Sequence, residues 1–83
     1  MDFLLKAQKT VVEAKMASAK LRDKAIGDQL IVDISRYQSH PACRRLVCFV
    51  YDPDGALRNP GGLERDLTGK HGELDVEVIV SPR

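Results

Sequence analysis

Asp2-Phe-Leu-Leu5 and Val11-Val-Glu-Ala-Lys15, joined by a polar stretch, decide the fold expected for this chain. Both segments are rich in residues that suit β-strands. Residues 6–9 form a polar connection of the length that hairpins use. The two segments therefore predict an antiparallel hairpin at the start of the chain.

The hairpin would bring three charged side chains to one place. In the register that sets Leu5 opposite Thr10, Asp2 lies opposite Glu13. Side chains alternate along a strand, so Glu13 and Lys15 share a face. Directly opposed Cβ atoms lie only ~5 Å apart, and like charges so placed repel each other. A divalent metal ion, helped by Lys15, would remove that repulsion.

A purely structural interpretation stands beside this one. Charged residues make up 30% of the chain, so a Glu-x-Lys triplet is expected somewhere by chance. An exposed ion pair contributes only ~0 to 1 kcal/mol. The triplet gains weight from its apolar strand context and from the acidic residue at the predicted cross-strand position.

Length and composition predict one small domain, residues 1–83. A hydrophobic fraction of 43% argues against disorder. No apolar run approaches the ~18 residues of a membrane span, and the first residues do not resemble a signal peptide. We expect a cytoplasmic protein with reduced thiols. Cys43 and Cys48, with the histidines, do not match the ligand spacing of a zinc site.

Positive charge is concentrated near the start of the chain. Residues 1–24 carry six basic and three acidic side chains, whereas the remainder carries seven basic and nine acidic ones. Such a basic region can steer a phosphate backbone toward the predicted site, although a solvated basic face is the common structural explanation. The candidate nucleic-acid contacts are Lys9, Lys20, Arg22, Lys24 and Arg36.

The rest of the chain predicts two helices and two strands. An apolar stripe at helical spacing indicates a helix over residues 23–38, with Asp23 as its N-cap. Gly27 inside that helix indicates close approach of a neighbour or a substrate. One flank of the stripe could border the active site, and it carries Arg22, Gln29, Asp33 and Arg36.

An apolar strand over residues 45–52 follows, which the intervening helix makes parallel to the strand carrying Glu13. Asp52-Pro-Asp-Gly55 has the residue order of a type I turn, and an Asp-x-Asp metal site there is the less economical alternative. A short helix begins at Asn59-Pro60 and ends near Leu67, and an alternating strand at 74–80 is expected at a sheet edge. The fold class is α/β (α+β): a mixed sheet of about four strands in the order β-β-α-β-α-β, with the main helix on one face.

These elements in this order resemble the PD-(D/E)XK nuclease superfamily, the restriction-endonuclease-like fold. The resemblance is closest to nuclease domains of restriction and antiviral-defence proteins. It rests on the Glu-x-Lys strand, on Ile26-Gly-Asp-Gln-Leu-Ile-Val-Asp-Ile-Ser-Arg-Tyr37 and on Leu46-Val-Cys-Phe-Val-Tyr-Asp-Pro-Asp-Gly55. It covers nearly the whole chain.

The resemblance implies roles for individual residues. Asp2 and Glu13 would be metal ligands, with the carbonyl of Ala14 as a third, and Lys15 would position the attacking water or balance charge at the transition state. Gln29 falls where related nucleases often keep a helix glutamine near the site. The implied cofactor is Mg²⁺ or Mn²⁺, and the implied reaction is hydrolysis of a phosphodiester bond of nucleic acid. DNA is the expected substrate, and the sequence leaves RNA open as the alternative.

The family core usually has a helix and a strand before the first acidic residue, and here only Met1 precedes Asp2. A domain truncated in this way would leave an open strand edge and an uncovered sheet face, which invite pairing with another chain. We therefore expect a homodimer, a larger assembly or a partner chain that supplies the missing elements. The alternative to a nuclease is a noncatalytic binding or assembly module with the same fold.

Overall fold

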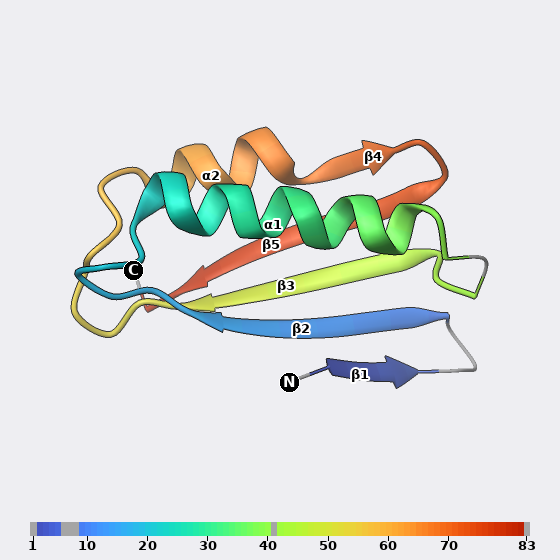
Figure 1. Ribbon diagram of the computed structural model, residues 1–83, viewed down its shortest axis with the longest axis horizontal. Coiled ribbons are helices and arrows are strands. Elements are labelled where there is room, and N and C mark those ends of the chain that lie inside the picture. The colour runs from blue at the N-terminus through green and yellow to red at the C-terminus, as the bar shows by residue number, and fades with distance from the viewer. Residues whose placement is uncertain (1, 6–8, 41, 83) are drawn as a thin grey trace.

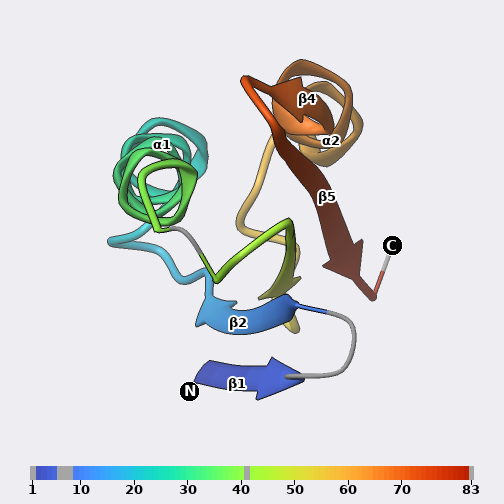
Figure 2. The ribbon, with the colours of Figure 1, turned by 90° about the vertical axis from the view of Figure 1, so that its right-hand side faces the viewer.

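A mixed sheet carries the fold; the longer helix packs on one of its faces, and the shorter helix lies at its edge (Figures 1 and 2). The computed structural model describes residues 2–5, 9–40 and 42–82, the first of these ranges by its backbone alone. Within them the sheet has five strands in the spatial order β1-β2-β3-β5-β4. The elements are β1 (Asp2–Leu5), β2 (Thr10–Met16), α1 (Asp23–Gln38), β3 (Arg45–Tyr51), α2 (Pro60–Leu67), β4 (Gly69–His71) and β5 (Leu74–Ser81).

The hairpin forms in the predicted register. β1 and β2 are antiparallel, with Leu5 opposite Thr10 and Asp2 opposite Glu13. β2 then pairs in parallel with β3, through the connection that contains α1. β3 pairs in parallel with β5, so β3 is the central strand.

The strand at Leu74–Ser81 is not at the sheet edge, and that expectation was wrong. β4 pairs antiparallel with β5 and covers its outer side. The two strands are joined by a tight turn at Gly72, whose φ of 65° favours glycine. A strand of three residues is too short to show an alternating pattern, which is why the sequence did not reveal β4.

α1 has the predicted bounds, but its N-cap is Arg22 and not Asp23. Asp23 is the first helical residue, and its carboxylate accepts hydrogen bonds of 2.8 Å from the backbone N–H groups of Arg58 and Asn59. The carboxylate of Asp23 therefore links the start of α1 to the start of α2. Asn59 is the N-cap of α2 as predicted, since its side chain accepts a hydrogen bond from the Gly62 N–H, and Pro60 opens that helix.

The loop after β3 is explained by turn chemistry. The N–H of Gly55 donates to the carbonyl of Asp52 across 3.3 Å. The buried Asp52 carboxylate accepts from the N–H groups of Ala56 and Leu57 at 2.7 and 3.0 Å. The two oxygens of Asp52 thus hold the loop together.

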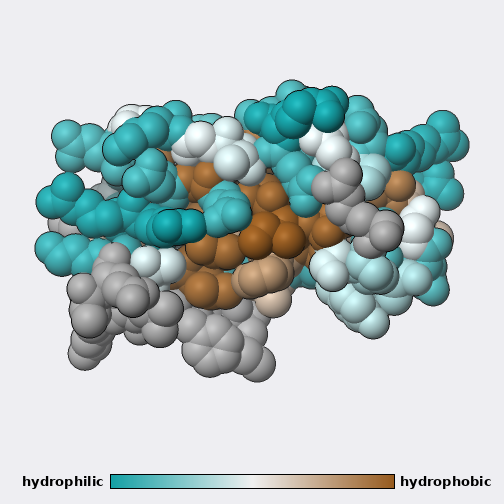
Figure 3. All heavy atoms as spheres, turned by 180° about the vertical axis from the view of Figure 1, so that it is seen from behind, coloured by the Kyte–Doolittle hydropathy of each residue, from teal (hydrophilic) through white to brown (hydrophobic). Residues whose placement is uncertain are grey.

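The core lies on one side of the sheet, between the strands and the helices. Alternate residues of β2, β3 and β5 are buried there against α1 and α2. The opposite face exposes Met16, Phe49 and Tyr51. Figure 3 shows apolar side chains in a band across the middle of this face, with hydrophilic ones along its border. None of the described helices is long and apolar enough to cross a membrane.

Candidate active site

Glu13 and Lys15 share a face of β2, as strand alternation predicted, and the structure shows that this is the covered face. Val11, Glu13 and Lys15 are buried or half-buried, whereas Ala14 and Met16 between and after them are exposed. Glu13 is only 6% exposed. Acidic and basic side chains are rarely buried to this degree without partners. This part of the covered face therefore holds charged side chains and their partners in place of an apolar core.

Lys15 is held by a carboxylate from α1. Its Nζ lies 2.6 Å from Oδ2 of Asp33, and the side chains are 18% and 6% exposed. The other oxygen of Asp33 lies 3.7 Å from Nη2 of Arg36, whose side chain is more than half exposed. Asp33 therefore connects the inner ammonium group with a surface guanidinium group.

Cys48 lies close to the charged residues Glu13, Asp33 and Lys15. It is the β3 residue paired with Glu13, and it is fully buried. The pKa of the Cys48 thiol is raised to about 12, chiefly by burial and then by the negative charges of Glu13 and Asp33, while the charge of Lys15 acts in the opposite direction. The thiol thus lies within electrostatic reach of two carboxylates and one ammonium group.

The cluster opens to solvent through a hollow of about 360 Å³ beside α1. The residues that line it are Lys15, Asp28, Gln29, Val32, Asp33 and Arg36. Gln29 lies one helical turn before Asp33, so the two share a face of α1. The predicted helix flank does border the Lys15 cluster, and Gln29 lies at the same hollow as Lys15.

The remaining predicted ligands are placed by the backbone. Asp2 pairs with Glu13 across the hairpin, and its side chain lies outside the described part of the chain. Ala14 lies between Glu13 and Lys15, with its side chain exposed on the opposite face.

The donor set of this site suits a divalent cation of the Mg²⁺ type. Lys15 and Arg36 both pair with Asp33, which leaves the buried carboxylate of Glu13 as an oxygen ligand of the kind that Mg²⁺ prefers. Among the described residues no three His, Cys, Asp or Glu side chains lie close enough to hold an ion together. Mg²⁺ commonly takes only one or two carboxylates and keeps several waters. Glu13, the Ala14 carbonyl and Asp2 at its paired position would therefore suffice.

The basic residues fall into two groups. Lys20, Arg22 and Lys24 line a second hollow of about 300 Å³, which shares Asp28 with the first. They form a basic rim at the start of α1, whereas Arg36, in the last turn of α1, lines the first hollow. Lys9 lies just before β2, six residues from Lys15 and hence ~20 Å away along the strand. The structure thus brings four of the five predicted contacts near the site and separates Lys9 from them.

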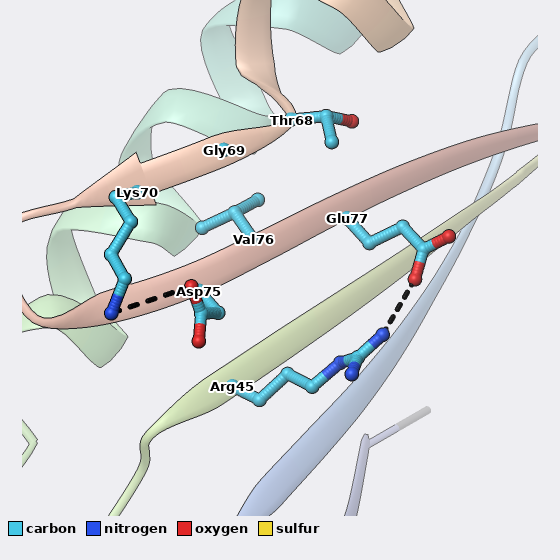
Figure 4. Close-up of a pocket in the computed structure, with 7 residues that line it drawn as sticks. All are labelled: Arg45, Thr68, Gly69, Lys70, Asp75, Val76 and Glu77. Carbon is cyan, nitrogen blue, oxygen red and sulfur yellow. Dashed lines mark hydrogen bonds and ion pairs between the residues drawn. The ribbon is translucent and has the colours of Figure 1, made fainter.

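Another hollow, of about 300 Å³, lies where β4 meets the open side of β5 and β3 (Figure 4). Its charged side chains pair with one another. Arg45 and Glu77 lie 2.7 Å apart, and Lys70 and Asp75 lie 3.6 Å apart. This hollow is remote from Glu13 and carries no separate site.

Asp33 is the one member of the cluster to which the sequence assigned no role. Its position on the helix flank was predicted, but its burial and its contact with Lys15 depend on how α1 docks on β2. The available signal was its spacing of four residues from Gln29 on a helix that follows the Glu-x-Lys strand.

Comparison with known proteins gives one match. The family model described as REase_DpnII-MboI, a restriction endonuclease family, matches residues 1–83. No curated protein and no solved structure matches the chain.

Proposed function

Because this chain belongs to the DpnII-MboI restriction endonuclease family, we propose that it hydrolyses phosphodiester bonds of DNA with the help of a divalent metal ion at Glu13 and of the ammonium group of Lys15. The enzyme class follows from the family, whose members are restriction endonucleases. The metal dependence and the residue roles are our proposal. Restriction of invading DNA would make the protein part of an antiviral defence.

The observation that carries the proposal is the burial of Glu13 beside Lys15 on the covered face of β2. A strand that served only as structure would bury apolar side chains at these positions. Instead, Glu13 is buried there, and Lys15 lines a hollow that reaches solvent. The predicted partner of Glu13, Asp2, is set opposite it by the hairpin.

Glu13 would bind the ion, with Asp2 and the Ala14 carbonyl as further ligands. A bound Mg²⁺ or Mn²⁺ supplies Lewis-acid chemistry, since it polarises a phosphoryl oxygen and makes water a stronger nucleophile. The walls of α1 and β2 around Glu13 limit the access of bulk water, which strengthens the electrostatic interactions inside the site.

Lys15 would bind the reacting phosphate through its ammonium group. An ammonium group offers three N–H donors and no acceptor, so it can donate to a phosphate oxygen or orient a water molecule. Donors that are fixed in place where negative charge develops lower the barrier because they need no reorganisation. Gln29, at the edge of the same hollow, would add an amide donor and acceptor.

The basic rim would hold the DNA backbone in place. Lys20, Arg22 and Lys24 are exposed and surround one hollow next to the site. Contacts of this type give affinity that depends on salt but not on base sequence.

Single-turnover cleavage of a labelled DNA duplex tests the proposal. We expect cleavage with Mg²⁺ or Mn²⁺ and none with EDTA. Glu13→Gln and Lys15→Ala are expected to lose at least ~100-fold in rate while circular dichroism still shows the native fold. Asp66→Asn, an exposed change on α2, serves as the matched control for loss of one carboxylate. Equal cleavage by wild type and Glu13→Gln would reject the proposal.

One observation favours a second candidate, a noncatalytic assembly module. The face of the sheet opposite the helices is uncovered and apolar in its middle (Figure 3). Patches of this kind commonly mark protein contacts. A stable oligomer that shows no Mn²⁺ binding in a titration would support this candidate over the nuclease.

A further inference from the structure

Asp33 differs from the other charged residues of α1. It is 4% exposed, whereas Lys24, Asp28 and Arg36 are exposed. A carboxylate in this position loses most of its hydration, and only nearby cations or hydrogen bonds make up for the loss. For Asp33, the nearby cations are Lys15 and Arg36.

Both oxygens of Asp33 face basic groups of the site. Oδ2 lies 2.6 Å from the Nζ of Lys15, and Oδ1 lies 3.7 Å from Nη2 of Arg36. Lys15 comes from the strand, and Arg36 comes from the helix at the rim of the hollow. The buried carboxylate of Asp33 thus pairs with the ammonium group of Lys15 and also lies near the exposed guanidinium group of Arg36.

The position of a lysine ammonium group depends strongly on a fixed partner such as the Asp33 carboxylate. Its ammonium group is a compact charge on a flexible four-carbon chain. Glu13, two residues earlier on the same face of β2, is the carboxylate to which an unanchored Lys15 would turn. An ammonium group that pairs with Glu13 competes with a cation for that carboxylate.

We propose that Asp33 is the positioning residue of this site: it holds the ammonium group of Lys15 at the hollow, away from competition for Glu13, and so keeps Glu13 available to a divalent cation. The inference rests on the proposed function, because it assigns Glu13 to the metal. Asp33 acts through Lys15 and touches neither metal nor DNA.

A double-mutant cycle on Mn²⁺ affinity tests this inference without relying on cleavage. The four proteins are the wild type, Asp33→Asn, Lys15→Met and the double variant, titrated with MnCl₂ by calorimetry. We expect Asp33→Asn to raise the Kd for Mn²⁺ at least ~10-fold, as is usual when a residue that supports a metal site is lost. In the Lys15→Met background the same change should raise Kd less than ~3-fold, because no ammonium group remains to compete for Glu13.

Asp28→Asn is the matched control. Asp28 lies on the same helix and lines the same hollow, but its carboxylate pairs with Lys24 at 2.9 Å. It therefore measures the effect of removing one negative charge near the site without releasing Lys15. The inference is overturned if Asp33→Asn raises Kd by the same factor in both backgrounds, or by no more than Asp28→Asn does. In either case Asp33 would act only as a distant charge.

Two further measurements separate this inference from the proposed function. Wild-type protein that binds Mn²⁺ and cleaves no DNA would refute the nuclease, while the affinity cycle would still decide the role of Asp33. Wild-type protein that binds no Mn²⁺ would refute the metal site and this inference together. With cleavage present, Asp33→Asn is expected to lower kcat ~10-fold or more at unchanged KM, and Asp33→Glu, which keeps the charge, to recover part of the rate. A change in KM alone would contradict the positioning role.

Discussion

Burial of charge distinguishes the residues of the site from the rest of the chain. Glu13 and Asp33 are almost completely buried, and both lie within electrostatic reach of Cys48. Strand alternation predicted that Glu13 and Lys15 share a face. Their burial, and the contact with Asp33, depend on the docking of α1 and could not be predicted from a local pattern.

Cys48 provides a prediction at the residue scale. Its pKa is raised to about 12 from an ordinary value of 9.0. Between these values the unfolded chain loses the thiol proton and the folded chain keeps it, so stability falls as pH rises above 9. Relative to Cys48→Ala, the wild type is expected to lose ~1 kcal/mol of unfolding free energy per pH unit there. Urea unfolding from pH 8 to 10 checks this, and parallel curves for the two proteins would contradict it.

Asp23 provides a prediction with the opposite sign. Its pKa is lowered below 3.8, chiefly by the hydrogen bond from the Arg58 N–H group. A carboxylate with a lowered pKa contributes stability that is present above pH ~4 and is lost as pH falls through its folded value. Asp23→Asn is therefore expected to lower stability at pH 7 and to flatten its fall below pH 4. Thermal unfolding from pH 2 to 7 measures the difference between the variant and the wild type. An unchanged slope below pH 4 would show that Asp23 is solvated in solution.

At the scale of elements, the sequence predicted the helices and the hairpin, because their signals lie within a few neighbouring residues. The helix bounds at Asp23–Gln38 follow from the apolar stripe, and the start of α2 follows from Asn59 and Pro60. The hairpin register follows from the length of its connection. β4 was missed because three residues carry no period, and β5 was placed at the edge for the same reason.

Two glycines test the helix packing as a matched pair. A Cβ on Gly27 would meet Leu63 Cδ2 at 3.5 Å, which is ordinary contact, so Gly27→Ala is expected to stabilise the protein by ~0.5 to 1 kcal/mol. A Cβ on Gly62 would collide with the side chain of Asn59, which caps α2. Gly62→Ala is expected to cost at least ~1 kcal/mol. Urea unfolding of both variants measures these changes, and destabilisation by Gly27→Ala would mean that α1 and α2 lie closer than described.

At the scale of the whole molecule, the sheet is covered on one face only. Figure 2 shows α1 on one side of the sheet and α2 beside β4, at the edge of the sheet. Phe49 and Tyr51 of the central strand are 43% and 53% exposed on the other side, beside Met16. An uncovered sheet face was among the expectations drawn from the sequence.

Self-association is the prediction that belongs to this scale. We expect a mass above that of a monomer by light scattering at micromolar concentration, because burial of this face removes apolar surface from water. Phe49→Asp with Tyr51→Asp should shift the mass to that of a monomer. Ile31→Asp, the same kind of change at an exposed apolar residue of α1, serves as the control. A monomeric wild type would contradict the prediction.

The most direct test of the account is to locate the metal. Anomalous diffraction from crystals grown with MnCl₂ would show where Mn²⁺ binds and which oxygens it contacts. The account predicts one peak between the carboxylates of Glu13 and Asp2, at ~2.0 to 2.3 Å from a Glu13 oxygen, with the Lys15 ammonium group still on Asp33. A peak at any other residues, or no peak in crystals of a protein that cleaves DNA with Mn²⁺, would contradict it.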